Sequence, residues 1–151
     1  MYQNDSEGNC TIKAKIRLDY QGTTVPKRFW AGRKSSEEIS EEIRDQQALG
    51  LRNLAFQGVK VEEVDQSTSV YNVKDPITEE ETSFAPTIVT LEADTLEDLV
   101  DFAMREEFRK VDIISPDSLC LSGREVGRLL ATVNRKMREN VELMSRQMEK
   151  S

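Results

Sequence analysis

The side chains best suited to chemistry in this sequence are carboxylates, because histidine is absent and cysteine occurs only twice. Without histidine, the chain forms neither a Ser-His-Asp nor a Cys-His nucleophile pair, and it has no histidine ligands for zinc. Asp94, Asp98 and Asp101 lie close together if the segment is helical, and such a group could hold Mg²⁺. Acidic residues are also common in the first turn of a helix, where they complement the helix dipole, and we favour that explanation.

Other chemical motifs are missing. The chain contains neither of the usual glycine-rich nucleotide loops. A metal-dependent nuclease that joins carboxylates to a basic surface is the one enzymatic alternative, but no motif singles out its residues. We therefore expect no catalytic residues, no metal and no cofactor, and a protein that is not an enzyme.

Two features indicate a reducing compartment and an aqueous environment. Cys10 and Cys120 lie far apart, and Cys10 sits in a polar terminus, so a disulfide framework is not expected. The first ten residues lack the pattern of an export signal, and no stretch approaches the roughly 18 to 20 apolar residues that span a bilayer. We expect a cytoplasmic protein that does not contact a membrane.

The net charge of −7 is distributed unevenly. Residues 35–107 carry 19 acidic and 5 basic side chains, whereas residues 11–34 carry seven basic side chains against Asp19 alone. Residues 11–20 alternate apolar and polar side chains, which predicts a half-buried strand. Gln21-Gly22 predicts a turn, and residues 23–30 predict a second strand pairing back on the first.

This predicted basic hairpin gathers cations and one tryptophan on a single surface. The candidate contact residues are Lys13, Lys15, Arg17, Lys27, Arg28, Trp30, Arg33 and Lys34. Such a surface suits an acidic protein partner or, as an alternative, the phosphates of a nucleic acid. Charged strand faces also prevent aggregation, and these cations can pair with the acidic segment of the same chain.

The middle of the chain predicts an α+β fold. Ser35 with Glu38, and Thr95 with Asp98, have the spacing of helix N-caps. The first helix is expected to bury Ile39, Ile43, Leu51 and Leu54, and the second Leu96, Leu99, Val100 and Ala103. Strands are expected at 59–64, 87–93 and 110–114. This order predicts an antiparallel sheet with helices on one face, resembling a ferredoxin-like arrangement.

We divide the chain into three parts. Residues 1–10 are expected to form a disordered N-terminal segment. Residues 11–121 are expected to form one α+β domain, with a mobile acidic loop at 65–86 that includes a short strand around 70–73. Residues 122–151 are expected to form a C-terminal helix, which begins at a Ser122/Glu125 capping box.

The C-terminal helix carries an apolar stripe with an eleven-residue repeat. Its members are Val126, Leu130, Val133, Met137, Val141, Met144 and Met148. Eleven residues in three turns is close to the natural period of a helix, so the stripe runs nearly parallel to the axis. Its first half is expected to pack on the sheet, and its second half to meet a second copy as a coiled coil, or a groove in another protein.

Together these features predict a non-enzymatic interaction module or adaptor. We expect it to form a homodimer through the C-terminal helix and to contact an acidic partner through the basic hairpin. The alternative is a nucleic-acid-binding accessory protein that uses the same hairpin, although the acidic overall charge opposes this function.

Overall fold

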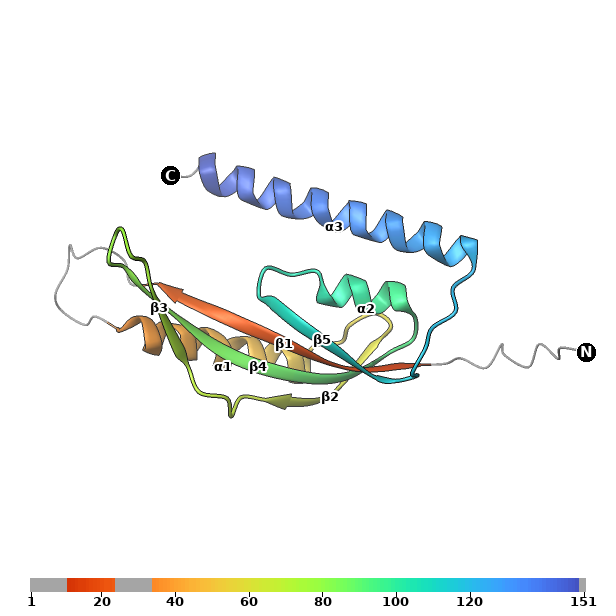
Figure 1. Ribbon diagram of the computed structural model, residues 1–151, viewed down its shortest axis with the longest axis horizontal. Helices are drawn as coiled ribbons and strands as arrows, with labels where there is room; N and C mark the ends of the chain where they lie inside the picture. Colours follow the sequence, from red (N-terminus) through yellow and green to blue (C-terminus); the bar gives the residue numbers. More distant parts are fainter. Residues whose placement is uncertain (1–10, 24–33, 150–151) are drawn as a thin grey trace, which may run out of the picture.

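The computed structural model describes residues 11–23 and 34–149. It shows an α+β fold, as predicted: a five-stranded antiparallel sheet with three helices (Figure 1). In chain order, the elements are β1 (Ile12–Thr23), α1 (Ser36–Asn53), β2 (Val59–Asp65), β3 (Tyr71–Lys74), β4 (Glu81–Ala93), α2 (Leu96–Ala103), β5 (Phe108–Ser115) and α3 (Gly123–Glu149).

The sheet has the order β2-β4-β1-β5, and β3 pairs with the first part of β4. Strand β4 therefore lies between β1 and β2, which α1 connects, while β1 lies between β4 and β5, which α2 connects. Two interleaved β-α-β units of this kind form the ferredoxin-like arrangement that the order of the predicted elements indicated. The arrangement leaves β5 at one edge of the sheet.

One face of the sheet carries the core. Alternate side chains of β1 are buried on this face: Ile12, Ala14, Ile16, Leu18 and Tyr20. They pack in one apolar cluster with Leu51 of α1 and with Leu99 and Phe102 of α2. Because residues of both helices join the same cluster, α1 and α2 cover the same face. The opposite face, which carries Lys13, Lys15 and Arg17, is the open face of the sheet.

Helix α1 buries a different set of residues from the one expected. Its buried residues are Ser36, Ser40, Ala48 and Leu51, while Leu54 is exposed and Ile39 and Ile43 are only partly buried. The reason is the close approach of the helix to β1. A Cβ atom on Gly22 would lie 2.4 Å from the Ser36 carbonyl oxygen, so only small side chains fit between helix and sheet. The helix also continues through Gly50 to Asn53.

Two further expectations need correction. The predicted turn at Gln21-Gly22 is wrong, because β1 continues through both residues, which pair with Phe84 and Ser83 of β4. The strands that pair with β1 are β4 on one side and β5 on the other. Residues 65–86, expected to be a loop with a short strand around 70–73, contain β3 at about that position and also the beginning of β4. Hydrogen bonds from α1, such as that from Arg44 Nη1 to the Thr68 carbonyl oxygen (3.0 Å), hold part of this segment against the helix.

All three predicted helix starts are present. The hydroxyl oxygens of Ser35, Thr95 and Ser122 each accept a hydrogen bond from the backbone N–H three residues later, at 3.1 to 3.2 Å. These bonds satisfy N–H groups that the helices themselves leave unpaired. None of the described helices is both long and apolar enough to cross a bilayer.

Candidate interaction surfaces

Helix α3 lies along α2 and is held there by polar contacts (Figure 1). The Thr132 hydroxyl donates a hydrogen bond to Glu97 at 3.0 Å, and Thr132 is the buried residue of the helix. Arg135 and Lys136 pair with Asp101 at 2.8 and 3.4 Å. The side of α3 that faces its own domain is therefore mostly polar.

The apolar stripe points away from this contact. At about 100° per residue, the seven stripe positions centre about 140° around the helix from Thr132. Val133, which is nearest to the contact, is partly buried, whereas Leu130 and Met144 are each 63% exposed. The exposed members of the stripe are Val126, Leu130, Met137, Val141, Met144 and Met148. The expected packing of the first half on the sheet is wrong, because α3 rests on α2 through Thr132.

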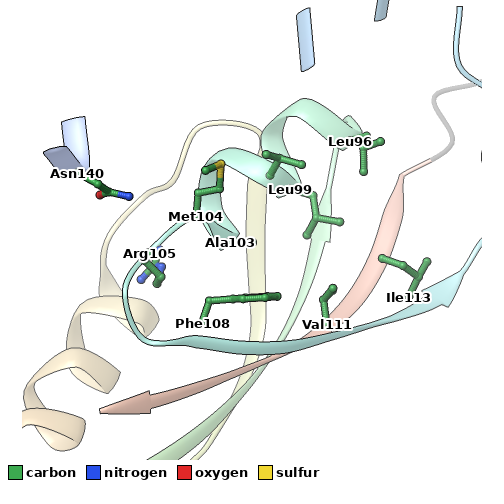
Figure 2. Close-up of a pocket in the computed structure, with 10 residues that line it drawn as sticks. Leu96, Leu99, Ala103, Met104, Arg105, Phe108, Val111, Ile113 and Asn140 are labelled. Carbon is green, nitrogen blue, oxygen red and sulfur yellow. The ribbon is translucent and has the colours of Figure 1, made fainter. Parts of the chain in front are cut away.

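An apolar pocket of about 580 Å³ lies beside α3 (Figure 2). Its walls come from α2, from β5 and from Asn140 of α3. Leu96 and Ile113 lie at one end of the pocket in this view, and Arg105 and Asn140 at the other. Phe108 and Val111 of β5 form its floor. The pocket therefore joins the exposed side of β5 to the flank of α3.

Strand β5 is exposed along nearly its whole length. Val111, Ile113 and Ile114 are between 38% and 43% exposed, although they are large and apolar. Val111 and Ile113 pair with the core residues Ile16 and Ala14 of β1, so they share the helix-covered face. They are accessible because the pocket lies between them and α2, so the helix does not pack directly on this edge of the sheet.

On the open face, the cations of β1 lie close to carboxylates of the same chain. Lys13 pairs with Glu62 at 3.4 Å, and Arg17 Nε pairs with Asp19 at 2.9 Å. The positive charge of Lys15 helps to lower the pKa of Asp65, after the larger effect of hydrogen bonds from Ser67. The predicted basic surface is therefore partly neutralised where the structure describes it.

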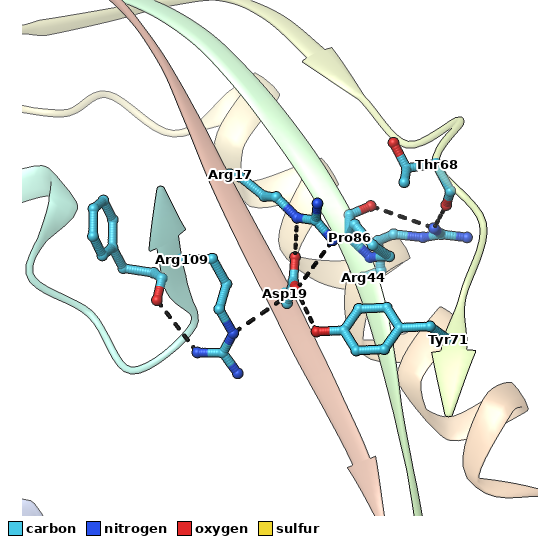
Figure 3. Close-up of polar contacts among 8 residues, drawn as sticks. Arg17, Asp19, Arg44, Thr68, Tyr71, Pro86 and Arg109 are labelled. Carbon is cyan, nitrogen blue, oxygen red and sulfur yellow. Dashed lines mark hydrogen bonds and ion pairs between the residues drawn. The ribbon is translucent and has the colours of Figure 1, made fainter. Parts of the chain in front are cut away.

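Asp19 is the centre of a polar cluster on this face (Figure 3). Its side chain is only 2% exposed and accepts hydrogen bonds from Arg17 and from the Tyr71 hydroxyl, the latter at 2.6 Å. Arg109 Nε lies 3.8 Å from the same carboxylate. The hydrogen bond with Asp19 raises the pKa of Arg17, and burial, followed by the hydrogen bond with Asp19, raises that of Tyr71. Tyr71 also stacks on Phe84, with ring centroids 5.2 Å apart.

This cluster consolidates the sheet. It joins β3, β1 and β5 through one buried carboxylate whose charge is compensated by two guanidinium groups. In the sequence, Asp19 stands out only as an exception in a basic segment, and no pattern singles out Tyr71 or Arg109. The only available signal was this isolated acidic residue within the basic segment.

Lys34, a predicted contact residue, pairs with Glu42 of α1 at 2.6 Å. The other predicted contacts, Lys27, Arg28, Trp30 and Arg33, lie outside the described residues, as does all of the predicted strand at 23–30 except its first residue. The candidate carboxylates have structural contacts: Asp98 accepts a hydrogen bond from Thr95, and Asp101 pairs with α3. In the described part of the chain, no three acidic or cysteine side chains are grouped as metal ligands.

Comparison with known proteins gave no match to a protein-family model, to a curated protein or to a solved structure.

Proposed function

We propose that this protein is a non-enzymatic interaction module that self-associates through α3. The observation that carries the proposal is the orientation of the apolar stripe, which faces away from α2 and is exposed at every position except the partly buried Val133. A helix of 27 residues, about 40 Å long, carries this stripe along one side.

Exposed apolar side chains in one continuous row indicate an interaction site, since monomeric proteins rarely leave such a surface in water. The helix makes its own intramolecular contact with polar residues, so the stripe is not needed to attach α3 to the domain. A second copy presents the same stripe, and a two-fold axis brings the two together. Methionine side chains in the stripe adapt to such a contact, because they are flexible and polarizable.

The proposal includes contact with an acidic partner through the basic segment at residues 11–34. Its support is the charge segregation in the sequence. The described cations of this segment already lie near carboxylates of the same chain, so the contact would depend most on the basic residues outside the described part. No structural observation favours nucleic acid as the partner, and we do not propose it.

Met144→Glu tests self-association. The substitution would place a carboxylate in the apolar contact once per copy, and burying an unpaired charge costs several kcal/mol. The dimer should therefore weaken by at least about 100-fold. The fold of each chain should be unchanged, because Met144 is 63% exposed in the isolated chain.

Light scattering and circular dichroism provide the measurement. Wild-type protein should have the mass of a dimer, and Met144→Glu the mass of a monomer with the same helix content. Ser145→Glu is the matched control, because it adds the same charge one residue away on the exposed polar side of α3 and should remain dimeric. A wild-type protein that stays monomeric at high concentration would contradict the proposal.

A further inference from the structure

Among the described residues, strand β5 is paired along one edge only. It hydrogen-bonds with β1, and no strand in the described part of the chain pairs with its other edge. The strand is eight residues long and exposed from Arg109 to Ser115. An exposed strand edge presents unpaired N–H and C=O groups, which can pair with a strand of another chain.

We propose that β5 strands from two copies pair antiparallel around a two-fold axis at Val111, joining both sheets into one. This inference rests on the proposed self-association and names the second part of the same interface. The partner is a second copy because the charges of β5 complement themselves in this one register.

The register follows from the faces and charges of β5. Lys110 and Asp112 share the open face, where their side chains pair at 3.3 Å and are 67% and 60% exposed. In an antiparallel pair, residues directly opposite each other lie on the same face. A two-fold axis at Val111 places Lys110 of each copy opposite Asp112 of the other. Two attractive charge pairs then form across the joint.

Other registers lose this complementarity. An axis at Asp112 sets the two Asp112 side chains opposite each other, and an axis at Lys110 does the same for the two lysines; both arrangements are repulsive. An axis at Ile113 places Asp112 opposite Ile114 and leaves its charge without a partner. The regular pairing of β5 with β1 extends from Lys110 to Ile113, so these are the four centres that the straight part of the strand offers.

The same register gathers apolar side chains on the other face. The two-fold axis is perpendicular to the sheet, so both copies place their helices on the same side. Val111 meets its own copy there, and Ile113 lies nearby on each strand. These side chains are 38% and 41% exposed and line the pocket beside α3, so pairing would cover apolar surface that the single chain leaves in water.

Charge reversal tests the register. Lys110→Asp makes both facing positions acidic, and Asp112→Lys makes both basic. The dissociation constant of the dimer should therefore be at least about tenfold higher for each variant alone than for wild type. A mixture of the two variants should recover wild-type affinity, because each facing pair is then one acid and one base. The intrachain Lys110–Asp112 pair is lost in both variants, so recovery can come only from contact between copies.

Sedimentation at several protein concentrations measures the affinities, and native mass spectrometry of a mixture with one chain isotopically labelled counts the mixed dimers. Lys60→Asp, on β2 at the opposite edge of the sheet, is the control and should dimerise as wild type does. A dimeric wild type whose two β5 variants keep full affinity, or whose mixture shows no recovery, overturns the inference but leaves self-association through α3 intact. A monomeric wild type overturns both.

Discussion

Replacing Gly22 with alanine should loosen the contact between α1 and the sheet. An ideal Cβ atom at this position would lie 2.4 Å from the Ser36 carbonyl oxygen, 2.4 Å from the Ser40 backbone nitrogen and 2.9 Å from Ser40 Cα. All three are backbone atoms, so no side-chain rotation can relieve the overlap. Non-bonded heavy atoms prefer separations of about 3.5 to 4.0 Å, so α1 would have to move by about 1 Å.

That movement has two costs. Overpacking a well-packed site typically costs about 1–3 kcal/mol. The hydroxyls of Ser36 and Ser83 share a buried hydrogen bond at 2.7 Å, and displacing α1 would remove about 1 kcal/mol more. We therefore expect Gly22→Ala to lower the free energy of unfolding by about 2–4 kcal/mol, a large part of the stability of a small domain.

Urea unfolding followed by circular dichroism measures this effect, with all variants compared at one protein concentration because dimerisation adds to stability. Gly127→Ala is the matched control. It lies within α3, and apart from its chain neighbours and the adjacent helix backbone no atom would come within 4 Å of its new Cβ, so it should stabilise the protein by about 0.5–1 kcal/mol. A Gly22→Ala protein within about 0.5 kcal/mol of wild type would refute the steric argument.

The remaining predictions concern buried polar groups. Burial raises the pKa of Tyr20 to about 12 against the opposing charge of Arg105, whereas an unfolded tyrosine ionises near pH 10. The unfolded chain therefore loses this proton first, and the free energy of unfolding should fall by about 2 kcal/mol as pH rises from 10 to 12. Urea titrations at several pH values measure this fall. In Tyr20→Phe, the part of the pH dependence that comes from Tyr20 should be absent. Asp19→Asn should cost about 1–3 kcal/mol, because it weakens the bonds from Arg17 and Tyr71, and Tyr71→Phe should cost about 1 kcal/mol. Equal urea midpoints for Asp19→Asn and wild type would show that the cluster does not hold the strands together.

Local patterns in the sequence predicted the elements well. The alternation at residues 11–20 identified β1, and Ser35, Thr95 and Ser122 identified the three helix starts. These features depend on neighbouring residues, which a single sequence displays directly. The order of strands and helices then limited the topology, because a β-α-β connection must return to the same sheet.

Contacts between distant residues were not predictable in the same way. Near Gly22, the buried side of α1 consists of the small residues Ser36 and Ser40, and this depends on the close approach of the helix to a residue that was predicted to lie in a turn. The Asp19 cluster joins residues 52 positions apart, so no local spacing indicates it. Long-range ion pairs, such as that of Lys13 with Glu62, also decide which cations of the basic segment remain available to a partner. The sequence does not display these pairs.

The way α3 attaches to α2 decides which surface is available for self-association. Helix α3 attaches to α2 through Thr132, Arg135 and Lys136, and this polar contact fixes its rotation so that the stripe faces outward. Val111 and Ile113 of β5 line the pocket beside Asn140 of α3 and stay partly exposed. Had the stripe itself packed on the domain, it would not be available to a second copy. A Thr132→Val variant, which removes the hydrogen bond to Glu97, should therefore weaken both the attachment of α3 and the dimer, whereas Met144→Glu should weaken the dimer alone.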